Sequence, residues 1–337
     1  MLGSYPLRVE IGAITNWFGG AVDAGRSFFN SFAQVDPVSL ALGMFVFILY
    51  LSMRALALYN TLGAAYPDSR IPYRNIWGAY IAAYGFNNVV PARGGDIIKF
   101  FLVKVSVQDS TYPAIGAAFI VESIFDLTIA IPVLAFAFSE GVFPNTPQLP
   151  KLGTLDLSFL STDPQLTLFI VTGLALLALI AFAFLSRRVV AFWFNVRQGF
   201  TILFDWRRYV REVWLVQFGG WLLRGASFWL LLDAFGIGGS VRNVMLVLGI
   251  NAVAALVPFT PGGAGVQQAL MVSVFGTAAT VAAYSVGQEV AIAVISIAVG
   301  FIALLTIFGF RSFGDVMRAG KAHRAAEKAE REDYRRP

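Results

Sequence analysis

The chain has 337 residues, of which 57% are hydrophobic and 13% are charged, and its formal net charge is +5. Because an ordinary soluble domain is about half apolar and about a quarter charged, this composition excludes a soluble globular protein and a disordered chain. The sequence has no cysteine, and its single histidine, His323, lies in a polar C-terminal segment, so disulfides, thiolate chemistry and His- or Cys-based metal sites are excluded.

The chain divides into three predicted regions. Residues 1–37 form an N-terminal interfacial segment, in which 11–32 mix charges with Phe and Trp and lack the uninterrupted apolar core of a signal peptide. Residues 38–310 form a transmembrane domain, and 311–337 form a charged cytoplasmic tail. The basic residues stand at the ends of apolar runs, which indicates contact with lipid headgroups and not with nucleic acid.

About eight runs are apolar over the length of about 20 residues that a membrane helix needs. Residues 166–185 are apolar on every side, which indicates a helix and not a barrel strand. We therefore predict an all-α polytopic membrane protein. Two of the runs, between 242 and 284, are short and interrupted by Gly and Pro, so re-entrant segments are an equal alternative there. The predicted spans are 38–60, 73–90, 112–138, 165–186, 212–234, 242–258, 265–284 and 287–310.

Lysine and arginine predict the orientation of these spans. Residues 187–211 carry six arginines, and the segment from Arg311 onward carries eight Lys or Arg, together 14 of the 25 basic residues. Basic connections mark the cytoplasmic side. The 139–164 loop has a single basic residue, Lys151, and is rich in Pro, Ser and Thr, so we expect it outside. Eight crossings of the cell membrane with both termini in the cytoplasm satisfy these assignments.

Two segments, one in each half of the chain, share a pattern of helix breakers. Proline removes a backbone donor and glycine allows close backbone approach, so each segment is expected to break its helix within the membrane. Paired breaks in two halves are typical of the central site of a transporter built as an inverted repeat. The alternative is coincidence, since Pro and Gly are common in membrane helices. The matching features are Val90-Pro91 with Gly94-Gly95 in 84–101 and Val257-Pro258 with Gly262-Gly263 in 251–270.

Several ionisable residues lie within the predicted spans, where an unpaired charge costs a few kcal/mol or more. Glu122 and Asp126 are four residues apart, so they share one helix face and repel one another unless a cation lies between them. Arg54 and Arg93 are the obvious shared partners. Such pairs would hold a basic group until a phosphate competes for it; the alternative is an ion pair that only fixes helix packing.

Two further charges, Arg224 and Glu289, interrupt later spans. Arg224 is expected either to pair with Asp233 or to extend toward the membrane interface. Glu289, like Glu122 and Asp126, is a possible proton carrier or a member of a structural ion pair.

A basic stretch follows the first predicted break. Arginine binds phosphate oxygens in a bidentate manner, and the interleaved Phe100 and Phe101 suit an acyl or prenyl chain. The stretch is therefore a candidate site for an anionic headgroup, and nonspecific contact with anionic lipids is the equal alternative. Backbone amides near Gly262 would favour an anion at a helix N-terminus. The charged residues of the stretch are Arg93, Asp96, Lys99 and Lys104.

These residues resemble the lysylphosphatidylglycerol synthase transmembrane-region family, the membrane part of bacterial aminoacyl-phospholipid synthase/flippases and of stand-alone relatives. The resemblance covers roughly residues 38–310. Three positions depart from the family pattern: Asp96 where Glu is usual, Ser123 where Arg often follows the glutamate, and Gln268 where Glu is common. The matching motifs are Asn87, Pro91-Ala92-Arg93-Gly94-Gly95-Asp96, Glu122 with Asp126, and Pro261-Gly262-Gly263-Ala264-Gly265-Val266.

The resemblance implies translocation of a lipid, such as an aminoacyl phospholipid or a polyprenyl-phosphate-linked sugar. In the bifunctional members a soluble domain makes the aminoacyl lipid; the 27 residues from Arg311 onward are too few for it, so we expect no catalysis by this chain. The partners expected are membrane lipids with phosphate-bearing headgroups, and a lipid-synthesis enzyme is a candidate partner. The alternatives are a membrane enzyme using Glu122 or Asp126 as acid or base, and a noncatalytic subunit of a cell-envelope synthase. Candidate substrate-binding residues are Arg54, Asn87, Arg93, Asp96, Lys99, Glu122, Asp126, Arg224, Gly262, Gly263 and Gly265.

Overall fold

The computed structural model describes residues 34–88, 94–142, 196–255, 266–276 and 279–310, together with six residues between 315 and 322. Every regular element in these parts of the chain is a helix, which confirms the all-α prediction. The predicted interfacial helix 11–32 and the predicted span 165–186 lie outside the described residues, and the division into three regions stays a prediction.

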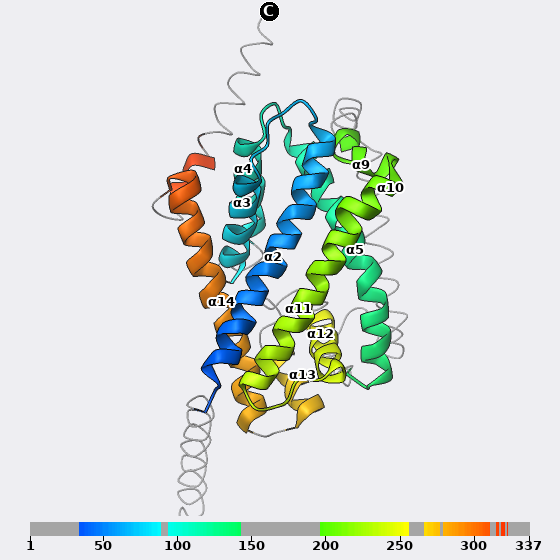
Figure 1. The fold of residues 1–337 in the computed structure, drawn as a ribbon, viewed down its shortest axis with the longest axis vertical. Coiled ribbons are helices and arrows are strands. Elements are labelled where there is room, and N and C mark those ends of the chain that lie inside the picture. The colour runs from blue at the N-terminus through cyan, green and yellow to red at the C-terminus, as the bar shows by residue number, and fades with distance from the viewer. Residues whose placement is uncertain are drawn as a thin grey trace, which may run out of the picture.

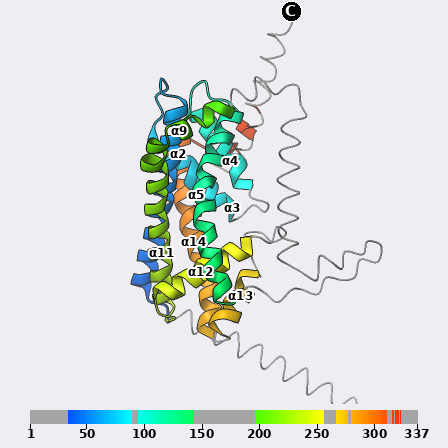
Figure 2. The same ribbon diagram turned by 90° about the vertical axis from the view of Figure 1, so that its right-hand side faces the viewer.

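Four helices in the described part are long and apolar enough to cross a membrane. Asp36 caps the first of them, because its carboxylate accepts hydrogen bonds from the backbone N–H groups of Val38 and Ser39. Figure 2 shows these long helices lying side by side along the long axis. They are α2 (Pro37–Ala65), α5 (Tyr112–Ser139), the continuous segment of α10 (Trp206–Tyr209), a π-helical turn (Val210–Trp214) and α11 (Leu215–Ala234), and α14 (Ala279–Ala303) with its π-helical end (Leu304–Phe308). A further short helix, α9 (Thr201–Phe204), precedes α10.

Four described helices of 10 to 15 residues are too short to cross. At about 1.5 Å per residue, a 15-residue helix spans roughly 22 Å, less than the hydrocarbon core of about 30 Å. They form two pairs at opposite ends of the bundle (Figure 1). The pairs are α3 (Tyr73–Asn87) with α4 (Gly94–Ser106), and α12 (Val241–Ala255) with α13 (Val266–Phe275). These pairs correspond to the two broken elements predicted from the sequence.

The predicted spans 265–284 and 287–310 require a correction. Helix α13 ends at Phe275, and Gly276, with φ +96°, follows it in the left-handed conformation that favours glycine. Helix α14 then runs without interruption from Ala279 through Gly287, which is buried inside the helix. The predicted boundary between these spans lay at 284–287, whereas the chain turns at Gly276.

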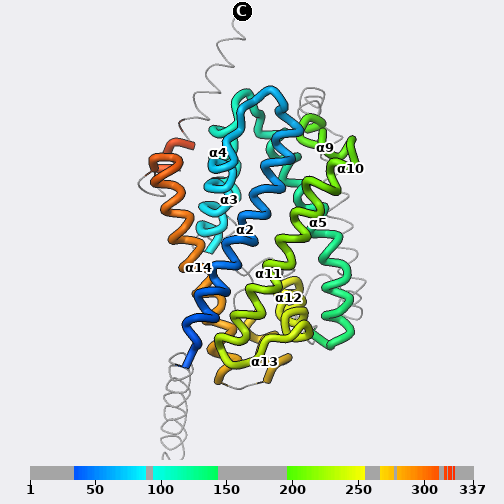
Figure 3. The backbone as a smooth tube through the Cα atoms, in the orientation of Figure 1, coloured from blue at the N-terminus to red at the C-terminus, as the bar shows by residue number. Residues whose placement is uncertain are grey.

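The two halves of the chain form an inverted repeat. Helices α2, α3, α4 and α5 contain 29, 15, 13 and 28 residues. The corresponding helical segments of the second half contain 29, 15, 10 and 30 residues. The halves exchange partners: α2 packs against α11, α3 packs against α14, and α12 packs against α5. In Figure 3, α2 and α11 run in opposite directions along the bundle.

The direction of α2 also differs from the predicted order of crossings. Eight crossings would make 38–60 parallel to 212–234, but α2 is antiparallel to α11 (Figure 3). The reason is that α3 and α4 return the chain to the end at which α2 finishes, so together they do not cross. Consequently α2 begins at the end of the bundle opposite to the one where α14 finishes (Figure 1).

The outer surface of α2 is apolar, as a lipid-facing helix requires. Val38, Leu42, Phe45 and Leu49 are exposed and recur at intervals of three or four residues. The same helix buries Phe47, Leu51 and Leu58 against the bundle core. Polar groups are therefore confined to the interior of the bundle along this helix.

Candidate functional site

Arg54 on α2 binds two carboxylates on α5. Its Nη2 atom lies 2.9 Å from Glu122 Oε1 and 2.8 Å from Asp126 Oδ2, and its Nη1 atom contacts Asp126 Oδ1. The side chains of Arg54 and Glu122 are only 11% and 4% exposed, whereas that of Asp126 is 52% exposed. The structure thus gives the two carboxylates a shared cationic partner, as their spacing on one helix face predicted.

The first broken element completes this cluster. The Tyr80 hydroxyl on α3 donates to Glu122 Oε1 at 2.5 Å and accepts a hydrogen bond from Arg54 Nε at 3.1 Å. Lys99 Nζ on α4 lies 3.8 Å from Glu122 Oε2 and 4.2 Å from the centre of the Phe119 ring. We call Arg54, Tyr80, Lys99, Glu122 and Asp126 the Arg54 cluster. Its two cations and two carboxylates balance.

Asn87 and Asp96 join α3 to α4. Asn87 Oδ1 accepts a hydrogen bond from the Gly95 N–H at 2.9 Å, and its Nδ2 donates to Asp96 Oδ1 at 3.3 Å. A Cβ atom on Gly95 would lie 2.0 Å from the carbonyl oxygen of Ala83, so only glycine fits this position. These contacts bring the end of one short helix against the start of the next.

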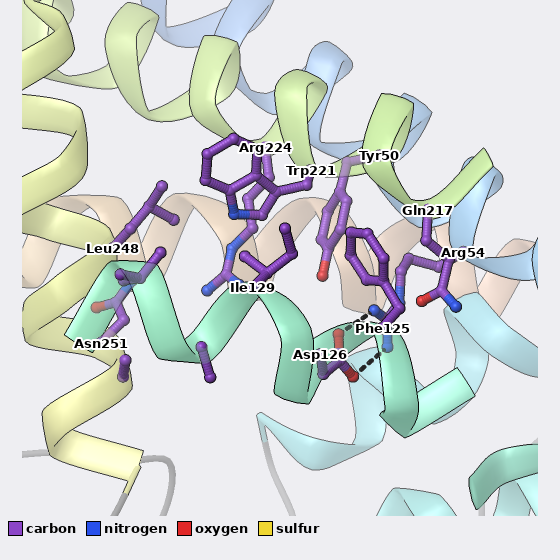
Figure 4. A pocket seen from close by; sticks show the side chains of 13 residues that line it. Tyr50, Arg54, Phe125, Asp126, Ile129, Gln217, Trp221, Arg224, Leu248 and Asn251 are labelled. Carbon is purple, nitrogen blue, oxygen red and sulfur yellow. Dashed lines mark hydrogen bonds and ion pairs between the residues drawn. The ribbon is translucent and has the colours of Figure 1, made fainter. Parts of the chain in front are cut away.

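A cavity of about 330 Å³ lies between α2, α5, α11 and α12. Figure 4 shows Arg54 and Asp126 at one end, Arg224 and Asn251 at the other, and Tyr50 between the two arginines. Among the described residues of the two broken elements, those that line the cavity belong to α12 of the second. The first element is connected to the cavity through other residues: Tyr80 contacts Arg54, and Lys99 contacts Tyr80 and Glu122. The lining residues are Tyr50, Arg54, Phe125, Asp126, Ile129, Ala130, Val133, Gln217, Trp221, Arg224, Leu248, Asn251 and Ala252.

Arg224 lies in a different environment from Arg54. Its guanidinium carbon lies 5.8 Å from the centre of the Tyr50 ring and 5.5 Å from that of Phe228, and its buried Nε has no hydrogen-bond acceptor. Asp233, the partner suggested by the sequence, instead accepts the N–H of Gly239 at 2.5 Å. Within the described part of the chain, no carboxylate forms an ion pair with Arg224.

Glu289 on α14 has a neutral partner. Its Oε2 atom accepts a hydrogen bond from Gln268 Nε2 on α13 at 2.9 Å. The interaction joins the second broken element to the last long helix, much as the Arg54 cluster joins the first broken element to α5.

Several residues of the site were not identified from the sequence. Tyr80 belongs to an apolar helix and is 42 residues from the carboxylate that it contacts, so no local pattern marks it. Gln217 carried a weak signal, because it is seven residues before Arg224 and therefore shares its helix face. Asn251 begins the second of the two segments compared for helix breakers. The predicted site residues Arg93, Gly262, Gly263 and Gly265 lie outside the described residues.

Comparison with known proteins identifies one family. The family model described as "Lysylphosphatidylglycerol synthase TM region" matches residues 13–309. A search of curated proteins gives no match. The matched region contains the Arg54 cluster, the cavity and both broken elements, so the family resemblance seen in the motifs extends over the whole described bundle.

Proposed function

The chain belongs to the lysylphosphatidylglycerol synthase transmembrane-region family, and from this premise we propose that it is a flippase or scramblase that moves an anionic or aminoacylated lipid between membrane leaflets. Membership implies a multi-pass membrane protein that acts on lipids. The observation that carries the finer proposal is the cavity of about 330 Å³, lined in part by charged and amide side chains, inside a bundle with an apolar outer surface. A headgroup crossing the bilayer needs such an interior polar surface, because the hydrocarbon core offers no hydrogen-bonding partners.

The size of the cavity favours a headgroup with its tails outside. Small-molecule sites commonly enclose about 300–1,000 Å³, so this cavity is at the lower end of the range. Asp126 is half-exposed, so its carboxylate is accessible to the ammonium of an aminoacylated headgroup. On binding that ammonium, Asp126 would give up part of its contact with Arg54. The Arg54 cluster would close again when the headgroup leaves.

The inverted repeat supports movement between leaflets. Two similar halves of opposite orientation give a protein two related arrangements, in which the central site opens to either side. Helices of the two halves pack against each other, since α3 contacts α14 and α12 contacts α5. A rearrangement of one half would therefore be transmitted to the other.

We also propose that the chain performs no chemical step on its lipid. Glu122 accepts hydrogen bonds or ion contacts at both oxygens, from Tyr80, Arg54 and Lys99, and this leaves it poorly placed as a free acid or base. Its partners would then be phosphate-bearing lipids, and any enzyme that makes the lipid would act separately.

For the orientation, we propose that the end of the bundle with Arg207 and Arg208 faces the cytoplasm of the cell, following the excess of basic residues there. Since α2 begins at the other end, a cytoplasmic N-terminus requires one more crossing before residue 37. The chain has no cysteine, so single cysteines at Ser69, between α2 and α3, and at the exposed Val241, where α12 begins, report the sidedness of the two ends without background from the chain. A membrane-impermeant maleimide applied to intact cells should label position 241 and not position 69.

The function is tested by reconstitution into liposomes that contain headgroup-labelled phosphatidylglycerol. A membrane-impermeant quencher reports how much label reaches the outer leaflet. Native protein should make nearly all the label accessible, and Ala130→Phe, which places a ring in the cavity, should slow this at least tenfold. Leu127→Phe is the matched control, because Leu127 is 66% exposed on the outer surface of the same helix. Unchanged protection with native protein, or equal rates for the two variants, would contradict the proposal.

A further inference from the structure

Arg224 brings an unbalanced positive charge into the cavity. The Arg54 cluster contains two cations and two carboxylates, so it is neutral as a unit. Arg224 adds one more cation, and its contacts in the described structure are aromatic rings and not carboxylates. Arg224 is partly buried, with its Nε atom fully buried, and a cation without a counter-ion is costly inside a membrane. The cavity therefore lacks one negative charge.

Neutral acceptors in the same cavity also lack partners. Asn251 Oδ1 and Gln217 Oε1 are buried, and no group of the described residues donates a hydrogen bond to either. Gln217 is held in place by its other end, because its Nε2 atom donates to the Glu122 carbonyl oxygen at 3.3 Å. Amide oxygens accept only from N–H or O–H groups. The cavity thus presents one unsatisfied cation together with two unsatisfied acceptors.

This combination specifies the chemistry of a ligand. A monoanion would balance Arg224, and guanidinium groups bind phosphate oxygens strongly. Hydroxyl or ammonium groups on the same ligand would donate to Asn251 and Gln217. Arg54 is a poorer receptor for the anion, because an anion there has to displace Glu122 and Asp126.

We propose that the Arg224 end of the cavity is an oxyanion subsite that binds a phosphate group, with Asn251 and Gln217 accepting hydrogen bonds from hydroxyl or ammonium groups of the same ligand. The rings of Tyr50 and Phe228 flank the guanidinium and hold it within the cavity. The inference rests on the proposed function in taking a lipid headgroup as the natural source of this phosphate. It concerns binding alone and does not require translocation.

Binding is measured on the purified full-length protein in a neutral detergent. The titrants are dihexanoyl phosphatidylglycerol, which has a phosphate monoanion and hydroxyls, dihexanoyl phosphatidylcholine, which has no N–H or O–H donor and no net charge, and inorganic phosphate. Trp221 lines the cavity, so tryptophan fluorescence reports occupancy. Native protein should bind the glycerol lipid at least tenfold more tightly than the choline lipid.

Two variants and one control locate the subsite. Arg224→Gln should weaken binding of the glycerol lipid at least tenfold, and Arg224→Lys should retain part of it. Arg207→Gln removes the same charge from an exposed site and should change binding less than twofold. Tighter binding of the glycerol lipid than of inorganic phosphate assigns the subsite to a headgroup, and the reverse assigns it to free phosphate; either supports an oxyanion subsite provided that Arg224→Gln abolishes it.

Equal affinity of native protein and Arg224→Gln for all three titrants would overturn the subsite. So would equal affinity of the native protein for the two lipids. If binding depends on Arg224 but native protein moves no lipid in liposomes, the subsite stands and the proposed translocation fails. The two proposals are therefore separable.

Discussion

The two halves of the bundle place an arginine at nearly the same position of their first long helix and surround it differently. Arg54 lies 17 residues after Pro37, and Arg224 lies 18 residues after Trp206. Arg54 is bound by Glu122, which lies ten residues into α5; Glu289 lies ten residues into α14 but bonds to Gln268 and not to Arg224. The fold therefore repeats while the charge pairing does not. Arg54 is bound by two carboxylates, and we propose that Arg224 is left for a ligand.

The largest effect on stability is expected when Arg54, the arginine bound by two carboxylates, is replaced. In Arg54→Gln, the buried carboxylate of Glu122 loses its main counter-ion, and breaking a buried pair in this way costs about 3–5 kcal/mol. We expect a large fall in the thermal unfolding midpoint, measured by tryptophan fluorescence in detergent. An unfolding midpoint close to that of the native protein would mean that the Arg54 cluster does not stabilise the bundle.

The next test concerns the first broken element, whose ends meet tightly. Gly95→Ala places a methyl group 2.0 Å from the Ala83 carbonyl oxygen, so α3 and α4 have to separate. Forced overpacking of this kind costs about 1–3 kcal/mol. The unfolding midpoint should fall, whereas Gly219→Ala, where nothing lies within 4 Å of the added atom, should leave it near the native value. Equal midpoints for the two variants would show that the close approach is not required.

Replacing Arg224, in contrast, is expected to leave the stability of the protein nearly unchanged. Arg224→Gln removes a cation that has no carboxylate partner, so ligand-free protein should keep its stability to within about 1 kcal/mol or gain some. The measurement is the same unfolding midpoint, in neutral detergent without added lipid. A loss as large as that of Arg54→Gln would remove the distinction between the two arginines.

The smallest effect is at a helix start outside the membrane span. Hydrogen bonds from the Ser39 side chain and backbone N–H lower the pKa of the exposed Asp36 carboxyl group. In the second half, Asp205 caps the corresponding segment by accepting a hydrogen bond from the Arg208 N–H. A lowered pKa means that the carboxylate stabilises the fold above the ordinary Asp pKa of about 3.9, and that this stabilisation is lost as the pH falls through the folded-state value. Asp36→Asn should remove this contribution to acid sensitivity, measured as unfolding midpoints at successive pH values. An identical pH dependence in the two proteins would contradict it.

The sequence predicted the parts of this arrangement that depend on local pattern. The apolar runs located α2 and α5 closely, and the four-residue spacing of Glu122 and Asp126 required a shared cation. The contacts of Tyr80 and Gln217 depend on how three helices pack, and no spacing along the chain encodes that. The end of α13 was misplaced because the small and apolar residues of 277–284 continue the apolar run past Gly276, where the helix ends.

We propose that the lipid headgroup passes through the cavity and binds Arg224 on the way. The most direct measurement compares native protein and Arg224→Gln in liposomes containing headgroup-labelled phosphatidylglycerol, after both have been shown to have similar unfolding midpoints. The account predicts that native protein exposes the inner-leaflet label to the quencher and that the variant does so at least tenfold more slowly. Exposure at the native rate by a well-folded Arg224→Gln protein would contradict it.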